Sequence, residues 1–147
     1  MKIILTADLC DAYMPNLQVV KPIGFKNYGK KKSFYGQIAT VKVYEANELI
    51  RAILEENGTG KVLVVDGAGS DRRALVGGNI AALAQANGWS GVIINGAIRD
   101  VLEIAEVDMA VLALYSNPHR SAKEVQGERD LTYADEDGIV VSEKDLS

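Results

Sequence analysis

The sequence has little cysteine, histidine or aromatic character, and each shortage excludes a class of protein. Cys10 is the only cysteine among 147 residues, so no disulfide can form within the chain, and we expect a reducing, cytoplasmic setting. His119 is the only histidine, which excludes zinc sites built from several histidines. Aromatic residues make up only 6% of the chain, so we expect a core of alanine, valine, isoleucine and leucine.

An excess of positive charge and long hydrophobic runs are also missing. The 20 acidic and 16 basic residues give a net charge of -4 and are spread along the chain, so no polycationic face serves nucleic acid or anionic lipid. The opening segment, MKIILTADLCDAY, has too short an apolar run for a signal peptide, and no later stretch reaches membrane-spanning length. We therefore expect no direct nucleic-acid partner, no membrane, and a mature protein that is the whole chain.

Hydrophobic patterning favours one α/β domain in which strands and helices alternate. The segment 61–69 is a continuous apolar run typical of a buried strand, and 79–89 has helical spacing that ends near Gly88. Because 91–100 repeats the pattern of a strand followed by a turn, we expect two adjacent parallel strands. The other expected elements are a helix within 2–13 capped by Thr6 or Asp8, a solvated turn at 26–32, a strand within 34–46, a helix within 47–60 with Gly58 as its stop signal, a helix at 101–108, a strand at 109–114, a loop at 115–123, and a tail at 133–147 with one short strand.

Two loops that follow predicted parallel strands are candidate ligand sites, because ligands of open α/β sheets gather at the carboxyl ends of the strands. The first loop begins at Asp66 and ends in Gly77-Gly78 directly before a helix. Glycines at that place leave backbone N–H groups free at the positive end of the helix, which suits a carboxylate or a phosphate. A dinucleotide fingerprint is disfavoured, because Arg72 stands where G-x-G-x-x-G needs its last glycine.

The second loop, residues 96–100, ends in the adjacent pair Arg99-Asp100. A guanidinium binds a carboxylate in bidentate fashion, and an aspartate can hold a divalent cation. The two residues would then share the binding of one anionic ligand. Spacing alone favours the plainer alternative, a surface ion pair or a helix-capping aspartate.

Other polar residues have simple structural interpretations. His119 lies in NPHRS, which is typical of an exposed loop rather than of a general base, and no G-x-S-x-G motif accompanies it as a serine hydrolase would require. Cys10 is interpreted as a packing residue of a helix. Asp8 and Asp11 are interpreted as part of a solvated helix face.

One long segment, LVVDGAGSDRRALVGGNIAALAQANGWSGVIINGAIRDV at residues 63–101, closely resembles the centre of the RraA-like family. That family includes the regulator of ribonuclease E activity A and the 4-hydroxy-4-methyl-2-oxoglutarate aldolases. TADLCDAY, NPHRSAKEVQGERD and YADEDGIVV resemble further segments of the family, so the resemblance covers nearly the whole chain. The aldolase branch is marked by a glycine, twenty intervening residues and then Arg-Asp, a spacing that Gly78 and Arg99-Asp100 meet.

The resemblance implies a metal-dependent lyase that acts on a small 2-oxo acid. The backbone around Gly77, Gly78, Asn79 and Ile80 would bind the pyruvoyl part of the substrate. Arg99 would bind its carboxylate and keto oxygen. Aldol cleavage and oxaloacetate decarboxylation both leave pyruvate enolate, whose oxygen needs a cation and an arginine more than the neutral ketone does.

The metal also follows from the resemblance, in which Asp100 would hold Mg2+ or Mn2+. The reaction needs in addition a base that takes the proton from the substrate's 4-hydroxyl group, and a metal-bound water or hydroxide could serve. Asp66 and Arg72 are supporting candidates. The enolate intermediate would let one site run both reactions.

For the fold, the resemblance implies a β/β/α arrangement like that of swivelling domains, with a mixed central sheet flanked by helices in a single domain of residues 1–147. It also implies a homotrimer with sites near the subunit contacts. Family members carry an extra pair of strands before the YADEDG-like segment, whereas only Leu131 and Thr132 separate Asp130 from Tyr133 here. We therefore expect a domain that is shortened near its C-terminus.

A function of a different class stays open, namely a protein inhibitor that binds ribonuclease E. The regulator branch resembles this chain but commonly lacks the aspartate after the arginine. Asp100 therefore favours catalysis over regulation.

Overall fold

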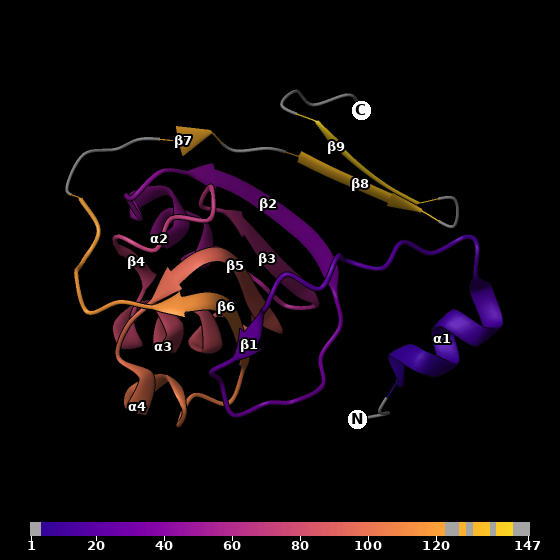
Figure 1. The fold of residues 1–147 in the computed structure, drawn as a ribbon, viewed down its shortest axis with the longest axis horizontal. Helices are drawn as coiled ribbons and strands as arrows, with labels where there is room; N and C mark the ends of the chain where they lie inside the picture. The colour runs from indigo at the N-terminus through magenta and orange to yellow at the C-terminus, as the bar shows by residue number, and fades with distance from the viewer. Residues whose placement is uncertain (1–3, 123–126, 129–130, 136–137, 143–147) are drawn as a thin grey trace.

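A β-sheet of seven strands lies at the centre of the molecule (Figure 1). The computed structural model describes residues 4–122, 127–128, 131–135 and 138–142. The elements, in chain order, are α1 Thr6–Tyr13, β1 Lys26–Asn27, β2 Gln37–Val43, α2 Glu48–Leu54, β3 Lys61–Asp66, β4 Ala74–Val76, α3 Gly78–Ala86, β5 Gly91–Ile98, α4 Val101–Ile104, β6 Ala110–Ser116, β7 Gly127–Glu128, β8 Leu131–Asp135 and β9 Gly138–Ser142.

The sheet is mixed, with a parallel centre and antiparallel edges. Its strands follow the order β1-β6-β5-β3-β2-β7, and β4 also pairs with β5. The pairs β2–β3, β3–β5, β4–β5 and β5–β6 are parallel, whereas β1 and β7 pair antiparallel with β6 and β2. The expected α/β class with a mixed sheet flanked by helices is confirmed, as is the expected adjacency of β3 and β5.

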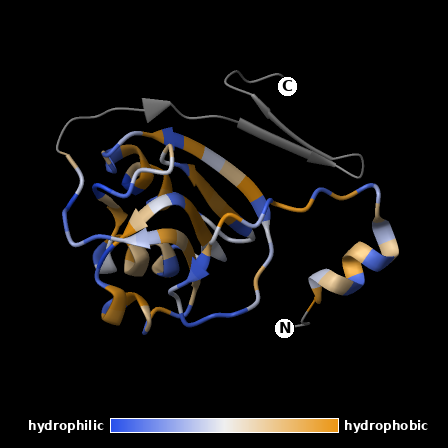
Figure 2. Cartoon of the chain, viewed as in Figure 1, coloured by the Kyte–Doolittle hydropathy of each residue, from blue (hydrophilic) through white to orange (hydrophobic). Residues whose placement is uncertain are grey.

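Alternation along the strands separates a fully buried face from a half-buried one. Leu63, Val65, Val92 and Ile94 are completely buried on the face covered by helices, where α3 contacts both α2 and α4. The intervening Val64 and Ile93 are paired in register and only half-buried. In Figure 2 the hydrophobic residues follow the strands and also the extended segment between α1 and β1.

The largest error of the sequence prediction concerns the segment between β3 and α3, which was expected to be a loop. Residues Ala74–Val76 instead form β4, and all three are buried. The neighbouring prediction of a turn at Gly96 is also wrong, because β5 runs on through Ile98. Both errors have one cause: β4 adds to β5 as a parallel partner, and a three-residue strand leaves almost no periodicity to detect.

The predicted solvated turn at residues 26–32 is wrong at its start, because β1 joins the edge of the sheet there. The Asn27 side chain stabilises this edge. Its Oδ1 accepts hydrogen bonds from the N–H groups of Gly29 (3.0 Å) and Val111 (3.2 Å), and its Nδ2 donates to the Lys31 carbonyl oxygen at 2.8 Å. A local side-chain network therefore replaces the expected solvated loop.

Helix α1 stands apart from the sheet (Figure 1) and buries none of its residues. It begins at Thr6, but Leu5 holds the capping position without a side-chain bond, so the predicted capping by Thr6 or Asp8 is wrong. Cys10 is only half-buried, which contradicts its interpretation as a packing residue, whereas Asp8 and Asp11 are exposed as expected.

Two other helix and strand limits differ from prediction. α2 ends at Leu54, one turn before the predicted stop at Gly58, and Gly58 instead lies against the indole ring of Trp89. The tail has two paired strands, β8 and β9, rather than the single strand expected. Within the described residues, no helix is both long enough and apolar enough to cross a membrane.

Candidate functional site

A cavity of about 130 Å³ lies beyond the carboxyl ends of β4 and β5. The last residues of these parallel strands, Val76 and Ile98, are paired in register, so Gly77 and Arg99 follow at the same edge of the sheet. The Arg99 N–H extends the ladder by donating to the Val76 carbonyl oxygen at 3.0 Å. The two loops chosen from the sequence therefore do meet. The cavity is lined by Asn47, Arg51, Ala74, Gly77, Asn79, Ile80, Arg99, Asp100, Arg120 and Ser121.

Asp100 connects the two loops through its side chain. Its backbone is left-handed, with φ 57° and ψ 47°, a conformation in which aspartate is among the better tolerated residues. Oδ2 accepts a hydrogen bond from the Gly78 N–H at 2.9 Å, so the carboxylate lies at the positive end of α3. The structural interpretation of Asp100 as a capping residue is thus correct for α3, although it makes no side-chain cap on α4.

Arg99 is half-buried in the wall of the cavity. Its Nη1 donates to the Pro118 carbonyl oxygen at 3.4 Å, which ties the side chain to the loop after β6. Among the described residues, no carboxylate forms an ion pair with Arg99. The remaining N–H groups of the guanidinium can bind an anion.

The two glycines explain why the aspartate can approach α3 so closely. A Cβ atom at Gly77 would lie 2.7 Å from Oδ2 of Asp100 and 3.4 Å from Cγ of Arg99. A Cβ atom at Gly78 would overlap the carboxylate of Glu103 and lie 3.0 Å from the Cβ atom of that residue. Any larger residue at either position would displace charged side chains from the first turn of α3. This close packing gives a physical reason why Gly78, which twenty residues separate from Arg99-Asp100, is a glycine.

The other predicted residues divide into two groups. Asn79 and Ile80 line the cavity with Gly77 and Arg99. Asp66 and Arg72 are not among the lining residues, because the Asp66 carboxylate accepts the Ala68 N–H at 2.9 Å and Arg72 pairs with Glu45. These two supporting candidates therefore do not reach the site. His119 is exposed as expected.

A divalent cation fits the donors present only if water and substrate complete its coordination. Within the residues that the structure describes, no three histidine, cysteine, aspartate or glutamate side chains gather to hold a metal. Asp100 uses Oδ2 for the Gly78 N–H, which leaves Oδ1 as a ligand directed by a fixed side chain. Mg2+ commonly keeps several waters and uses one or two carboxylates, so this donor set fits Mg2+ or Mn2+.

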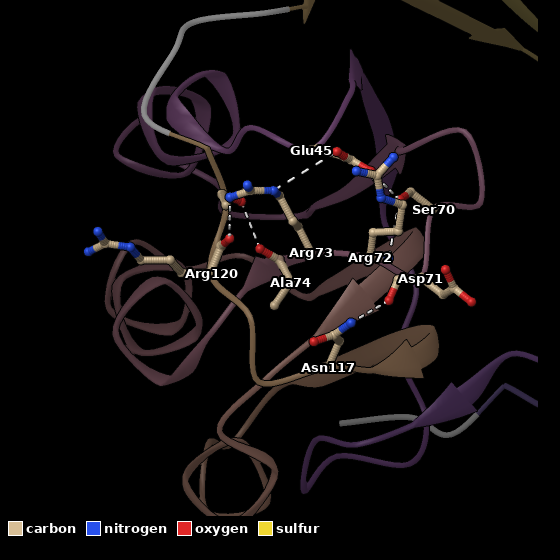
Figure 3. A network of polar contacts seen from close by, with 9 residues as sticks. Glu45, Ser70, Asp71, Arg72, Arg73, Ala74, Asn117 and Arg120 are labelled. Carbon is tan, nitrogen blue, oxygen red and sulfur yellow. Dashed lines mark hydrogen bonds and ion pairs between the residues drawn. The ribbon is translucent and has the colours of Figure 1, made fainter.

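A polar network lies next to the cavity and is connected to it through the backbone of Arg120 (Figure 3). The sequence analysis did not identify this network. Glu45 is nearly buried, and its carboxylate pairs with Nε of Arg72 at 3.4 Å and of Arg73 at 4.0 Å. Ser70 Oγ donates to the same carboxylate at 3.0 Å. The network holds the loop that leads from β3 into β4. Glu45 carries no motif that could have revealed it, apart from being a glutamate at the end of an apolar strand.

Comparison with known proteins gives a consistent result. A family model described as RraA-like, aldolase/RraA, matches residues 6–141. A relative in Alkalilimnicola ehrlichii, provisionally named a 4-hydroxy-4-methyl-2-oxoglutarate aldolase, is 46% identical over 155 residues, which cover 96% of each chain. A provisionally named aldolase of Arabidopsis thaliana is 46% identical over 161 residues, covering 97% of this chain and 96% of its own.

Two solved structures share the fold at high similarity. The RNA-processing inhibitor RraA from Thermus thermophilus has a TM-score of 0.83 and 41% identity, covering 100% of this chain and 96% of its own. A protein from Geobacillus kaustophilus described as S-adenosylmethionine:2-dimethylmenaquinone methyltransferase has a TM-score of 0.84 and 43% identity, covering 97% of each chain. The same fold thus carries three different functional names.

Proposed function

The chain belongs to the RraA-like family, and from this premise we propose that it is a lyase that releases pyruvate. Its substrates are aldols of the 4-hydroxy-4-methyl-2-oxoglutarate type, oxaloacetate, or both. The observation that carries the proposal is the contact of the Asp100 carboxylate with the first N–H of α3, beside Arg99 in one cavity. The aldolase names of the two relatives support cleavage of a carbon–carbon bond as the kind of reaction.

Binding of the pyruvoyl end uses α3 and Arg99. The N–H of Gly78 is occupied by Asp100, but the N–H groups of Asn79 and Ile80 lie in the first turn, where a helix offers no acceptor. They and the helix dipole attract the substrate's carboxylate. The Arg99 guanidinium binds that carboxylate and the adjacent keto oxygen in its planar fork.

The chemical step builds negative charge on the keto oxygen. The bond between C3 and C4 breaks, and its electron pair forms the enolate. In the aldol the 4-hydroxyl group passes its proton to water and becomes a carbonyl, whereas oxaloacetate releases CO2. A proton from water then converts C3 of the enolate into the methyl group of pyruvate. Arg99 stabilises the enolate oxygen more than the neutral ketone, which lowers the barrier. Asp100 would hold Mg2+ or Mn2+, which supplies further positive charge for that oxygen when bound.

A turnover assay with oxaloacetate and with the aldol, each with Mg2+, tests the proposal. We expect Asp100→Ala and Asp100→Asn to lower kcat/KM by roughly 100-fold or more, since both remove the negative charge needed for the cation. Asp100→Asn keeps an oxygen that can accept the Gly78 N–H, so it is the matched control for the capping role. Wild-type turnover at the level of Asp100→Ala, or full activity of Asp100→Asn, would refute the proposal.

Binding of ribonuclease E is a second candidate function. The Thermus protein described as an RNA-processing inhibitor supports it, at 41% identity over the whole chain. A pull-down with ribonuclease E and an RNA cleavage assay test it. Inhibition that survives Asp100→Ala would establish regulation, whereas a failure to bind ribonuclease E would exclude it.

We also propose that the chain forms a homotrimer, as its resemblance to the family implies. Exposed apolar residues on the N-terminal segment support an assembly, because large side chains such as Leu5, Val19, Val20 and Ile23 are all more than half exposed. Large apolar side chains that a single chain exposes suit burial in a contact between subunits.

A further inference from the structure

The cavity has a second group of donors, to which the binding and chemical steps described above give no role. Arg51 from α2 and Arg120 from the segment after β6 line it together with Asn47. They come from different elements than Arg99, Asp100 and the first turn of α3. With Arg99 they give the lining three arginines against the single carboxylate of Asp100.

Two hydrogen bonds hold the backbone at Arg120 and at the residue after it. Its carbonyl oxygen accepts a hydrogen bond from Nη1 of Arg73 at 3.1 Å. The next residue, Ser121, is buried and donates through Oγ to the Ala74 carbonyl oxygen at 2.7 Å. Figure 3 shows the Arg120 side chain directed away from Glu45 and its arginine partners. In the part of the chain that the structure describes, no carboxylate forms an ion pair with Arg120, so its charge is available to a ligand.

Arg51 and Asn47 are four residues apart at the start of α2, where the Arg51 N–H donates to the Asn47 carbonyl oxygen at 3.0 Å. Residues at this spacing lie on one face of a helix. The Asn47 side chain makes no capping bond, and Asn47 also lines the cavity, where its amide NH2 group can donate to an anion. Among the described residues, Arg51 forms an ion pair with Glu55 at 3.7 Å, and both side chains are more than half exposed, so this pair is too weak to hold Arg51 away from an anion.

We propose that Arg51, Arg120 and Asn47 bind the second carboxylate that the proposed substrates carry at the end away from the 2-oxo group, and that these three residues set the preference for a dicarboxylate. The inference rests on the proposed lyase function for the identity of the first site. A monocarboxylate would bind only Arg99 and leave the other two arginines of the lining without an anion. A dicarboxylate neutralises both ends. In aldol cleavage the far carboxylate then departs on the second product, so that product is itself an oxo acid rather than a neutral aldehyde.

Calorimetric titration of the full chain in MgCl2 tests the site without requiring turnover. The probes are 2-oxoglutarate, with two carboxylates, and 2-oxobutyrate, with one. We expect the wild type to bind 2-oxoglutarate at least about tenfold more tightly than 2-oxobutyrate, because one charge-assisted hydrogen bond commonly contributes that much affinity. Arg120→Met and Arg51→Met should each raise the Kd of 2-oxoglutarate about tenfold while changing that of 2-oxobutyrate less than about twofold.

Lys30→Met is the matched control, because it removes one positive charge from an exposed residue near the amino end of β6, where the Lys30 N–H donates to Val107. It should leave both Kd values unchanged. Retained binding of 2-oxobutyrate also shows that each arginine variant is folded. The second site is overturned if the wild type binds the two acids equally tightly, or if the arginine variants lose affinity for both acids to the same extent. Either result leaves the lyase proposal to be tested by its turnover assay. A wild type that neither binds the acids nor turns over substrate refutes both proposals.

Discussion

At the scale of single residues, the missing Cβ atom at Gly77 decides where the Asp100 carboxylate lies. Gly77 has an extended backbone, with φ -120° and ψ -168°, so alanine there brings no backbone strain. Its Cβ would lie 2.7 Å from Asp100 Oδ2 and push the carboxylate off the Gly78 N–H. We expect Gly77→Ala to lower kcat/KM about 100-fold, as misplacement of a positioned group by about 1 Å does.

The control for this prediction is Gly60→Ala. Gly60 has nothing within 4 Å of a Cβ atom but has φ +74°, so alanine there strains the backbone and lowers stability by about 1 kcal/mol. Its activity should stay at the wild-type level. Steady-state kinetics and thermal melts of both variants separate the two effects, and a fully active Gly77→Ala enzyme would contradict the assigned geometry.

Glu45 is the residue on which the loop before β4 depends. Alanine at this position removes the partner of Ser70, Arg72 and Arg73 at once. We expect Glu45→Ala to lower the free energy of unfolding by about 1–3 kcal/mol, and Glu45→Gln, which keeps an acceptor for Ser70, by less. Urea denaturation measures this as a shift in midpoint at constant slope. Equal losses of unfolding free energy in the two variants would mean that the negative charge of Glu45, and not its hydrogen bond from Ser70, stabilises the loop.

At the scale of elements, the connection after α2 packs against the connection after α3. Trp89 is buried and its Nε1 donates to the Glu56 carbonyl oxygen at 3.2 Å. A Cβ atom at Gly58 would overlap the indole ring. We therefore expect Gly58→Ala to cost about 1–3 kcal/mol by overpacking and to shift the fluorescence of Trp89, the single tryptophan, toward exposed emission. An unchanged spectrum and melting temperature would contradict this packing.

The elements that could be predicted are those with a strong repeating pattern. β3 and α3 are long enough for their apolar spacing to show, and their order predicts the parallel pairing. β4 is too short for that, and its pairing with β5 is a tertiary contact. For the same reason, the sequence alone left Arg99 and Asp100 as an adjacent surface pair, and the family resemblance was needed to favour them. Glu103, which lies beside Gly78, and Glu45 contact residues distant in sequence, so no local signal indicates either.

At the scale of the whole molecule, two apolar surfaces support assembly. One is the half-buried row across the sheet, in which Ile93 is in register with Val64 and Leu112. The other is the extended segment with Val19 and Val20, exposed by 70% and 75%. Light scattering after size-exclusion chromatography should give the mass of three chains.

The double variant Val19→Asp/Val20→Asp tests the contribution of the extended segment. Both side chains are exposed in the single chain, so the substitutions should not unfold it. They should shift the population toward monomers, because charged side chains are disfavoured in the core of an interface. A trimer that is as stable as the wild type would place the contacts elsewhere.

The short edge strand β1 has a consequence for solubility at high concentration. An exposed edge strand offers unpaired N–H and C=O groups to which another molecule can add, and long flat edges promote fibre formation. β1 offers only two residues, and the chain then turns through hydrogen bonds to the Asn27 side chain. The molecule can therefore expose apolar surface for specific association, while the strand at this edge of the sheet is too short for further molecules to add to it one after another.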